Sequence, residues 1–166
     1  RRAARAFREA IALRPDEPAA YHNLGAALAN SEHFVEAAQR YLEAKERWPV
    51  GSEDWALATA WAFIMLVQDE CAEVAKPEWW NDEGLKALSA RVVRTVPDDG
   101  QAHQMRAVVL GRLDGACAWE AGPRSATELS EAATHFDRAA ALCPAPAGQA
   151  HFAGCAAQCR SRAEAM

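Results

Sequence analysis

The sequence lacks a long hydrophobic run. Its longest apolar stretch, Trp55 to Val67, is interrupted by Thr59 and is about 13 residues long, whereas a membrane span needs roughly 20. The stretch therefore predicts a buried helix and no insertion into a membrane. No signal peptide pattern opens the chain, and because the first residue is Arg1 we expect that a preceding segment was removed or left out.

An excess of positive charge is also absent. The formal net charge is −5 and the isoelectric point is near 5.5. Arg91, Arg94 and Arg106 are scattered among carboxylates and form no basic stripe that could neutralise phosphates. This composition argues against nucleic acid as the main partner.

The chain has five cysteines, an odd number in a protein large enough to have its own core. A disulfide framework is not expected, which favours a reducing intracellular compartment, either the cytoplasm or the interior of an organelle. Catalytic motifs are missing as well: there is no glycine-rich phosphate loop, no HExxH and no Ser/His/Asp constellation with a supporting motif. We therefore expect neither an enzyme nor a cofactor.

What is present favours helix throughout. The 166 residues are 51% hydrophobic and 25% charged, which suits a single soluble domain with its own core. Alanine and arginine are abundant, and both have high helix propensity. The sequence predicts an all-α fold.

One pattern occurs three times: a small residue, an aromatic residue, an alanine and a proline at fixed offsets. The instances are Ala3-Phe7-Ala10-Pro15, Ala37-Tyr41-Ala44-Pro49 and Ala132-Phe136-Ala139-Pro144. The first two prolines are about 34 residues apart, and between them lies Tyr21-x-x-Leu24-Gly25-x-x-Leu28. At helical spacing, the small residues allow two antiparallel helices to approach closely and the aromatic residues fill the space beside them. Together these residues resemble the tetratricopeptide repeat (TPR) family.

The resemblance implies an α-solenoid of antiparallel helix hairpins along one domain, 1–166. Its parts are a half repeat at 1–15, a full repeat at 16–49, enlarged repeats at 50–97 and 98–144, and a capping helix at 145–166. The two enlarged repeats are each about 13 or 14 residues longer than the norm. We expect their first helices to run from Glu53 to about Val74 and from Asp99 to Trp119, with Ser52 as an N-cap and Ser125 opening a capping box.

For function, the resemblance implies a non-catalytic scaffold that binds a peptide or protein segment in a concave groove lined by first helices. Carried over by position, the candidate binding residues are His22, Asn23, Asn30, Leu57, Gln101, Gln104, Met105 and Arg112, beside Val108. Asn23 matches an asparagine that family members use to bond a ligand's backbone. Two alternatives stay open: an architectural subunit of a larger assembly that uses outer faces, and a recruiting module fused to an upstream enzyme.

Two further groups have both a functional and a structural interpretation. Trp79 and Trp80 follow Pro77 in the first enlarged repeat and could anchor a partner, although we favour a role in sealing the helix pair. His151, Cys155 and Cys159 share one helix face, where a soft metal could bind a histidine and a thiolate. Ordinary small buried cysteines are the favoured interpretation, so no metal site is predicted.

Overall fold

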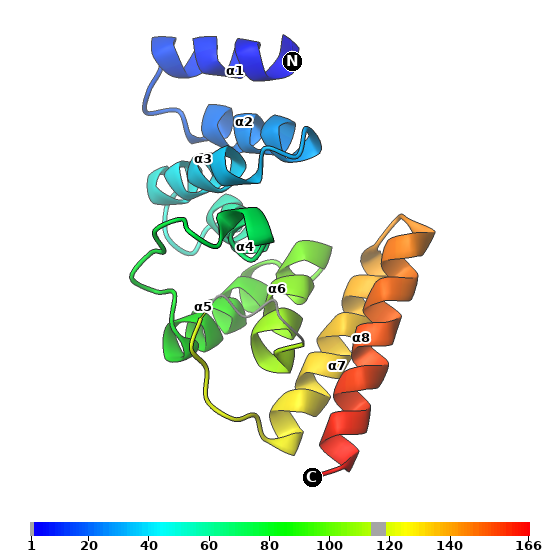
Figure 1. Cartoon of the computed structure of the whole chain (residues 1–166). Coiled ribbons are helices and arrows are strands. Elements are labelled where there is room, and N and C mark those ends of the chain that lie inside the picture. The colour runs from blue at the N-terminus through cyan, green and yellow to red at the C-terminus, as the bar shows by residue number, and fades with distance from the viewer. Residues whose placement is uncertain (1, 114–118) are drawn as a thin grey trace. The chain divides into compact units, whose positions relative to one another are not determined.

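A computed structural model describes residues 2–113 and 119–166, and within these residues every regular element is a helix. In chain order they are α1 (Arg2–Leu13), α2 (Pro18–Asn30), α3 (Phe34–Arg47), α4 (Glu53–Leu66), the short 3-10 helix η1 (Asp69–Cys71), α5 (Asp82–Thr95), α6 (Gly100–Gly111), α7 (Ala126–Leu142) and α8 (Pro146–Glu164) (Figure 1). The all-helical prediction is confirmed for this part of the chain.

The chain forms two compact units, Arg1–Lys76 and Pro77–Met166. In the first unit α1 packs on α2, α2 on α3 and α3 on α4, and α3 also contacts η1. In the second unit α5 packs on α6, α6 on α7 and α7 on α8. Each helix thus buries its apolar side mainly against its neighbours in the sequence.

The predicted helix starts are confirmed. Ser52 Oγ accepts a hydrogen bond from the backbone N–H of Trp55 at 3.2 Å and begins α4. Ser125 and Glu128 form the reciprocal capping box of α7. Each cap satisfies donors that the first helical turn leaves without a partner.

The predicted end of α4 at Val74 is wrong, because the helix ends at Leu66. Gln68 has an extended backbone that turns the chain into η1. The Lys76 ammonium then donates hydrogen bonds to the carbonyls of Cys71 and Val74, at 2.6 and 2.8 Å. These bonds satisfy carbonyls that a continuing helix would have bonded internally.

The predicted end of α6 at Trp119 is also wrong. The helix ends at Gly111, and Arg112 adopts a left-handed backbone conformation with φ 44° that stops helical bonding. Trp119 lies outside any helix, and residues 114–118 are outside the described residues. The last helix, α8, begins at Pro146, since proline is well suited to the first helical turn.

Close approach of α2 and α3 organises the first unit. A Cβ atom on Gly25 would lie 3.1 Å from the Tyr41 ring, so only glycine leaves room for that ring. Leu24 and Tyr41 are fully buried, and Tyr41 stacks on Trp61 of α4 with ring centroids 5.9 Å apart. The small and aromatic residues of the repeat pattern therefore link three consecutive helices.

The turn after α1 is fixed by the carbonyl of Pro15. Tyr21 donates its hydroxyl proton to this oxygen at 2.7 Å, and Arg47 Nε donates to it at 3.1 Å. The Arg47 guanidinium also lies over the Tyr21 ring, 4.1 Å from its centroid, which adds a cation–π contact. Three segments of the first unit meet at this point.

A buried arginine organises the second unit. Arg124 is bidentate to the Asp82 carboxylate, at 2.6 and 2.9 Å, and also donates to the carbonyls of Val109 and Leu110 near the end of α6. The bonds from Arg124, together with one from Trp119 Nε1, lower the pKa of Asp82 to about 2. This stabilisation is present above the unfolded-state pKa of about 3.9 and is lost as the pH falls towards 2.

Replacing Arg124 with methionine should strongly destabilise the protein. The change removes the bidentate partner of Asp82 and the donor to the α6 carbonyls, and removing one partner of a buried ion pair costs about 3 kcal/mol or more. The matched control is Arg138→Met, since Arg138 pairs with Asp98 in solvent and such pairs contribute about 0–1 kcal/mol. Urea unfolding at pH 7 measures the free energy of unfolding of both variants. Equal decreases in the two variants would contradict the role assigned to Arg124.

Alanine at Gly25 should destabilise the first unit by about 1–2 kcal/mol, because the new methyl group meets the Tyr41 ring. The control is Gly154→Ala in α8, where an added Cβ meets nothing within 4 Å. There the higher helix propensity of alanine should stabilise by about 0.5–1 kcal/mol. Thermal unfolding followed by circular dichroism compares the two variants. A change of melting temperature in the same direction for both would argue against the close contact of Gly25 with Tyr41.

Candidate functional site

The second unit contains an open surface pocket of about 280 Å³ between α6 and α8, here called the α6–α8 pocket. Its lining comes from α6, from the residues just after it, from α7 and from α8. The lining residues are Gln104, Val108, Leu113, Phe136, His151, Phe152, Cys155 and Gln158. None of them is Asp, Glu, Lys or Arg, so the pocket is neutral and mainly apolar.

The pocket exists because α6 approaches α7 and α8 closely at one end. A Cβ on Gly111 would lie 3.1 Å from Cys159 Sγ and 3.2 Å from the Phe136 ring. Phe136 and Phe152 stack with ring centroids 6.4 Å apart. The aromatic pair forms the apolar part of the lining, while α7 and α8 run side by side (Figure 1).

The pocket also holds a thiol beside an imidazole. Cys155 Sγ lies 3.7 Å from His151 Nε2 on the exposed side of α8. Burial raises the pKa of the Cys155 thiol and that of Cys159, so both favour the protonated form at neutral pH.

Among the cysteines described, Cys71 and Cys159 are fully buried, as expected, whereas Cys143 and Cys155 are only partly buried. Cys117 lies outside the described residues.

Two histidines join α6 to α7 one turn from this lining. His103 Nδ1 and His135 Nδ1 are 2.9 Å apart, and His103 Nε2 lies 2.7 Å from the Pro97 carbonyl. Because a carbonyl can only accept, neutral His103 carries its proton on Nε2 and accepts a bond from His135. Burial is the main cause that lowers the pKa of His135, and the neighbouring His103 lowers it further. The Glu131 carboxylate, whose Oε1 lies 3.5 Å from His135 Nε2, opposes this shift.

The predicted binding residues of the second unit are not all in the pocket. Gln104 and Val108 both line it. Met105 is fully buried in the core, and Gln101 is half-buried outside the lining. Arg112 is the C-cap of α6, and its side chain donates a hydrogen bond to the Ala121 carbonyl. Position along the helix therefore identified one side of α6 but not which residues a ligand could reach.

In the first unit the predicted residues lie on α2 and α4. Asn23 and Asn30 are exposed, and Leu57 is half-buried. His22 packs edge-on against Tyr41, with centroids 5.1 Å apart, and burial lowers its pKa. None of these four residues lines the pockets described in this unit, which lie beside α3.

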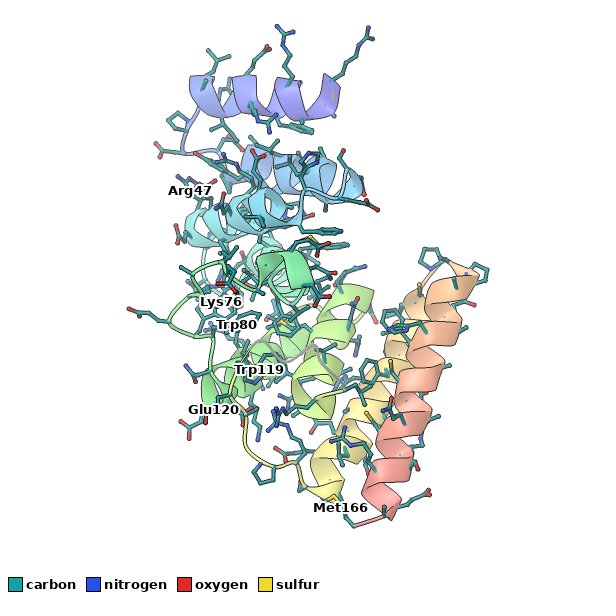
Figure 2. All side chains as sticks on the ribbon, viewed as in Figure 1. Arg47, Lys76, Trp80, Trp119, Glu120 and Met166 are labelled. Carbon is teal, nitrogen blue, oxygen red and sulfur yellow. The ribbon has the colours of Figure 1, made fainter. Side chains whose placement is uncertain are left out.

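The tryptophan pair is packed inside the second unit. Trp80 is 8% exposed and meets the edge of Trp119, with ring centroids 5.8 Å apart (Figure 2). Trp79 is half-buried, and its ring centroid lies 5.8 Å from that of Trp80. Since Trp119 also bonds to Asp82, this cluster seals the segment before α5, in agreement with the structural interpretation.

Sequence reasoning missed half of the pocket lining. Leu113, Phe136, Phe152 and Gln158 were not expected to form a binding surface. The pattern placed Phe136 in the repeat core, where it is buried, and only the position of α8 shows that it also lines the pocket. The spacing of His151 and Cys155 was the one signal in the sequence that pointed to this side of α8.

Comparison with known proteins gives no independent identification, because no family model matches the sequence and no curated protein shows significant similarity to it. In the part of the chain that the structure describes, no helix is long and apolar enough to cross a bilayer. The same residues contain no cluster of three or more His, Cys, Asp or Glu side chains able to hold a metal ion.

The histidine pair should make stability depend on pH. His135 has a lowered pKa in the folded chain, so the unfolded chain binds more protons near pH 6. The stabilisation is complete above the unfolded pKa of about 6.5 and is lost as the pH falls below it. Urea unfolding measures the free energy of unfolding at pH 7.5 and at pH 5.5. Between these two pH values it should fall less for His135→Gln than for the unchanged protein. The control is His33→Gln at an exposed position, and an equally reduced loss there would contradict the assignment.

Proposed function

We propose that this protein is a non-catalytic binding module, built as a TPR-like α-solenoid, that holds a segment of another protein in the α6–α8 pocket. The observation that carries the proposal is the pocket itself, a neutral and largely apolar depression of about 280 Å³. Its volume suits one or two side chains of a polypeptide, because small-molecule pockets usually begin near 300 Å³.

The architecture supports a TPR-like arrangement in two ways. Helices pack in sequence order in each unit, as stacked hairpins do. The close contact of Gly25 with Tyr41 occurs where the repeat pattern predicts it. In the resemblance, α6 corresponds to a first helix, which lines the concave face, and α8 corresponds to the capping helix. Gln104 and Val108 are at positions expected to face a ligand, and both line the pocket.

The chemistry of the lining indicates the kind of segment. Phe136 and Phe152 offer an apolar surface for one hydrophobic anchor side chain. Gln104 and Gln158 carry amides, which can donate to and accept from a peptide backbone. The absence of acidic and basic side chains from the lining favours an uncharged anchor. A helical or extended segment with one large hydrophobic residue meets these conditions.

Selection from a displayed random-peptide library tests the proposal on the full chain. Enriched peptides should share a hydrophobic anchor and bind with micromolar affinity. Val108→Glu, which places a charge on the apolar lining, should weaken binding by at least about 10-fold, since an unpaired buried charge costs more than 1.4 kcal/mol. Isothermal calorimetry measures the change.

The control is Ala157→Glu, at an exposed position of α8 outside the pocket lining. It should leave affinity unchanged. Gln104→Lys provides a second pocket variant that alters the rim without burying a charge. Circular dichroism and urea unfolding establish that each variant is folded. Peptides that bind all three variants equally would show that the pocket is not the binding site.

A further inference from the structure

The side of α8 at the rim of the pocket carries the geometry of a metal-binding edge. His151 Nε2 and Cys155 Sγ are 3.7 Å apart and belong to the same helix, one turn from each other. In a tetrahedral zinc site with Zn–S near 2.3 Å and Zn–N near 2.0–2.1 Å, these two ligand atoms would be about 3.5–3.6 Å apart. The observed spacing therefore needs almost no rearrangement to place both atoms on one ion.

We propose that His151 and Cys155 bind a zinc ion that is completed by the same two residues of a second copy of this chain. The ion would have two imidazole and two thiolate ligands, which is a common set for structural zinc. This inference goes beyond the binding module proposed above and does not depend on it.

The need for a second copy follows from ligand number. The described residues of one chain supply a pair and no cluster of three or more ligands. A closed tetrahedral site requires four, and a two-fold axis through the ion supplies the missing pair from an identical surface. Cys159, although it follows at the same spacing, is fully buried against the end of α6 and does not take part.

The surface around the pair permits such an approach. Gly154 is exposed between the two ligands in the sequence, and a Cβ at this position would meet nothing within 4 Å. Ala147, one turn before His151, is also exposed and small. Small side chains therefore leave this part of α8 open on the side that a second copy would approach.

Zinc binding involves a proton as well as the metal. The Cys155 thiol must lose its proton to solvent to become a thiolate, so each chain releases one proton when the site fills. Because the ligand must be deprotonated, binding should tighten as the pH rises. No oxidant or reductant is needed, and the sulfur keeps its oxidation state.

Cobalt(II) is the probe for the test, because tetrahedral cobalt–thiolate sites absorb visibly. Titration of the full chain under a phosphine reductant should produce thiolate-to-cobalt and ligand-field bands that saturate at one cobalt per two chains. Zinc should displace the cobalt and double the molar mass in analytical ultracentrifugation, and a chelator should reverse both effects.

Three variants make the test specific. Cys155→Ser should weaken zinc binding by at least about 100-fold, whereas Cys143→Ser, at another partly buried thiol, should not change it. Gly154→Arg keeps both ligands but blocks the approach of a second helix, and it should abolish the mass change. The proposal is overturned if the bands are absent, if they persist in Cys155→Ser, or if one cobalt binds per monomer. Peptide binding measured in the absence of metal tests the proposed binding module and does not bear on the zinc site.

Discussion

Both units depend on helices that approach each other closely at glycine. Gly25 admits the Tyr41 ring between α2 and α3, and Gly111 allows the end of α6 to lie against Phe136 and Cys159. A methyl group at either position would press on a side chain that has little room to move. Because each helix packs mainly on its sequence neighbours, these contacts determine how closely neighbouring helices pack.

In the second unit, residues distant in the sequence also meet at the end of α6. There the longer connection brings Arg124 back to bond the carbonyls of Val109 and Leu110 while it pairs with Asp82 at the start of α5. A positive group at a helix C-terminus is favourable, and so is a carboxylate at an N-terminus. One side chain thus joins two helix ends that are far apart in sequence. Trp80 and Trp119 pack beside this bond network, because Trp119 also donates to Asp82.

The pocket combines two features that suit different kinds of binding. Its apolar lining around Phe136 and Phe152 suits a hydrophobic anchor from another polypeptide, whereas His151 and Cys155 at its rim suit a metal ion. A second copy held by the metal would cover part of the rim. Zinc and a bound segment would then compete for the same side of α8, and this link between assembly and binding follows from their shared residues.

The sequence by itself determined the all-helical fold of the described residues, the N-caps of α4 and α7 and the close approach of α2 and α3 at Gly25, because periodicity, capping and close packing depend on residues a few turns apart. It also named Gln104, which lies on the side of α6 that lines the pocket. The tertiary structure alone decided where α4 and α6 end, that Met105 is buried, and that Phe136 and Phe152 line a pocket. These outcomes depend on partners distant in the sequence, such as Arg124 with Asp82, and local spacing carries no information about which distant groups will meet.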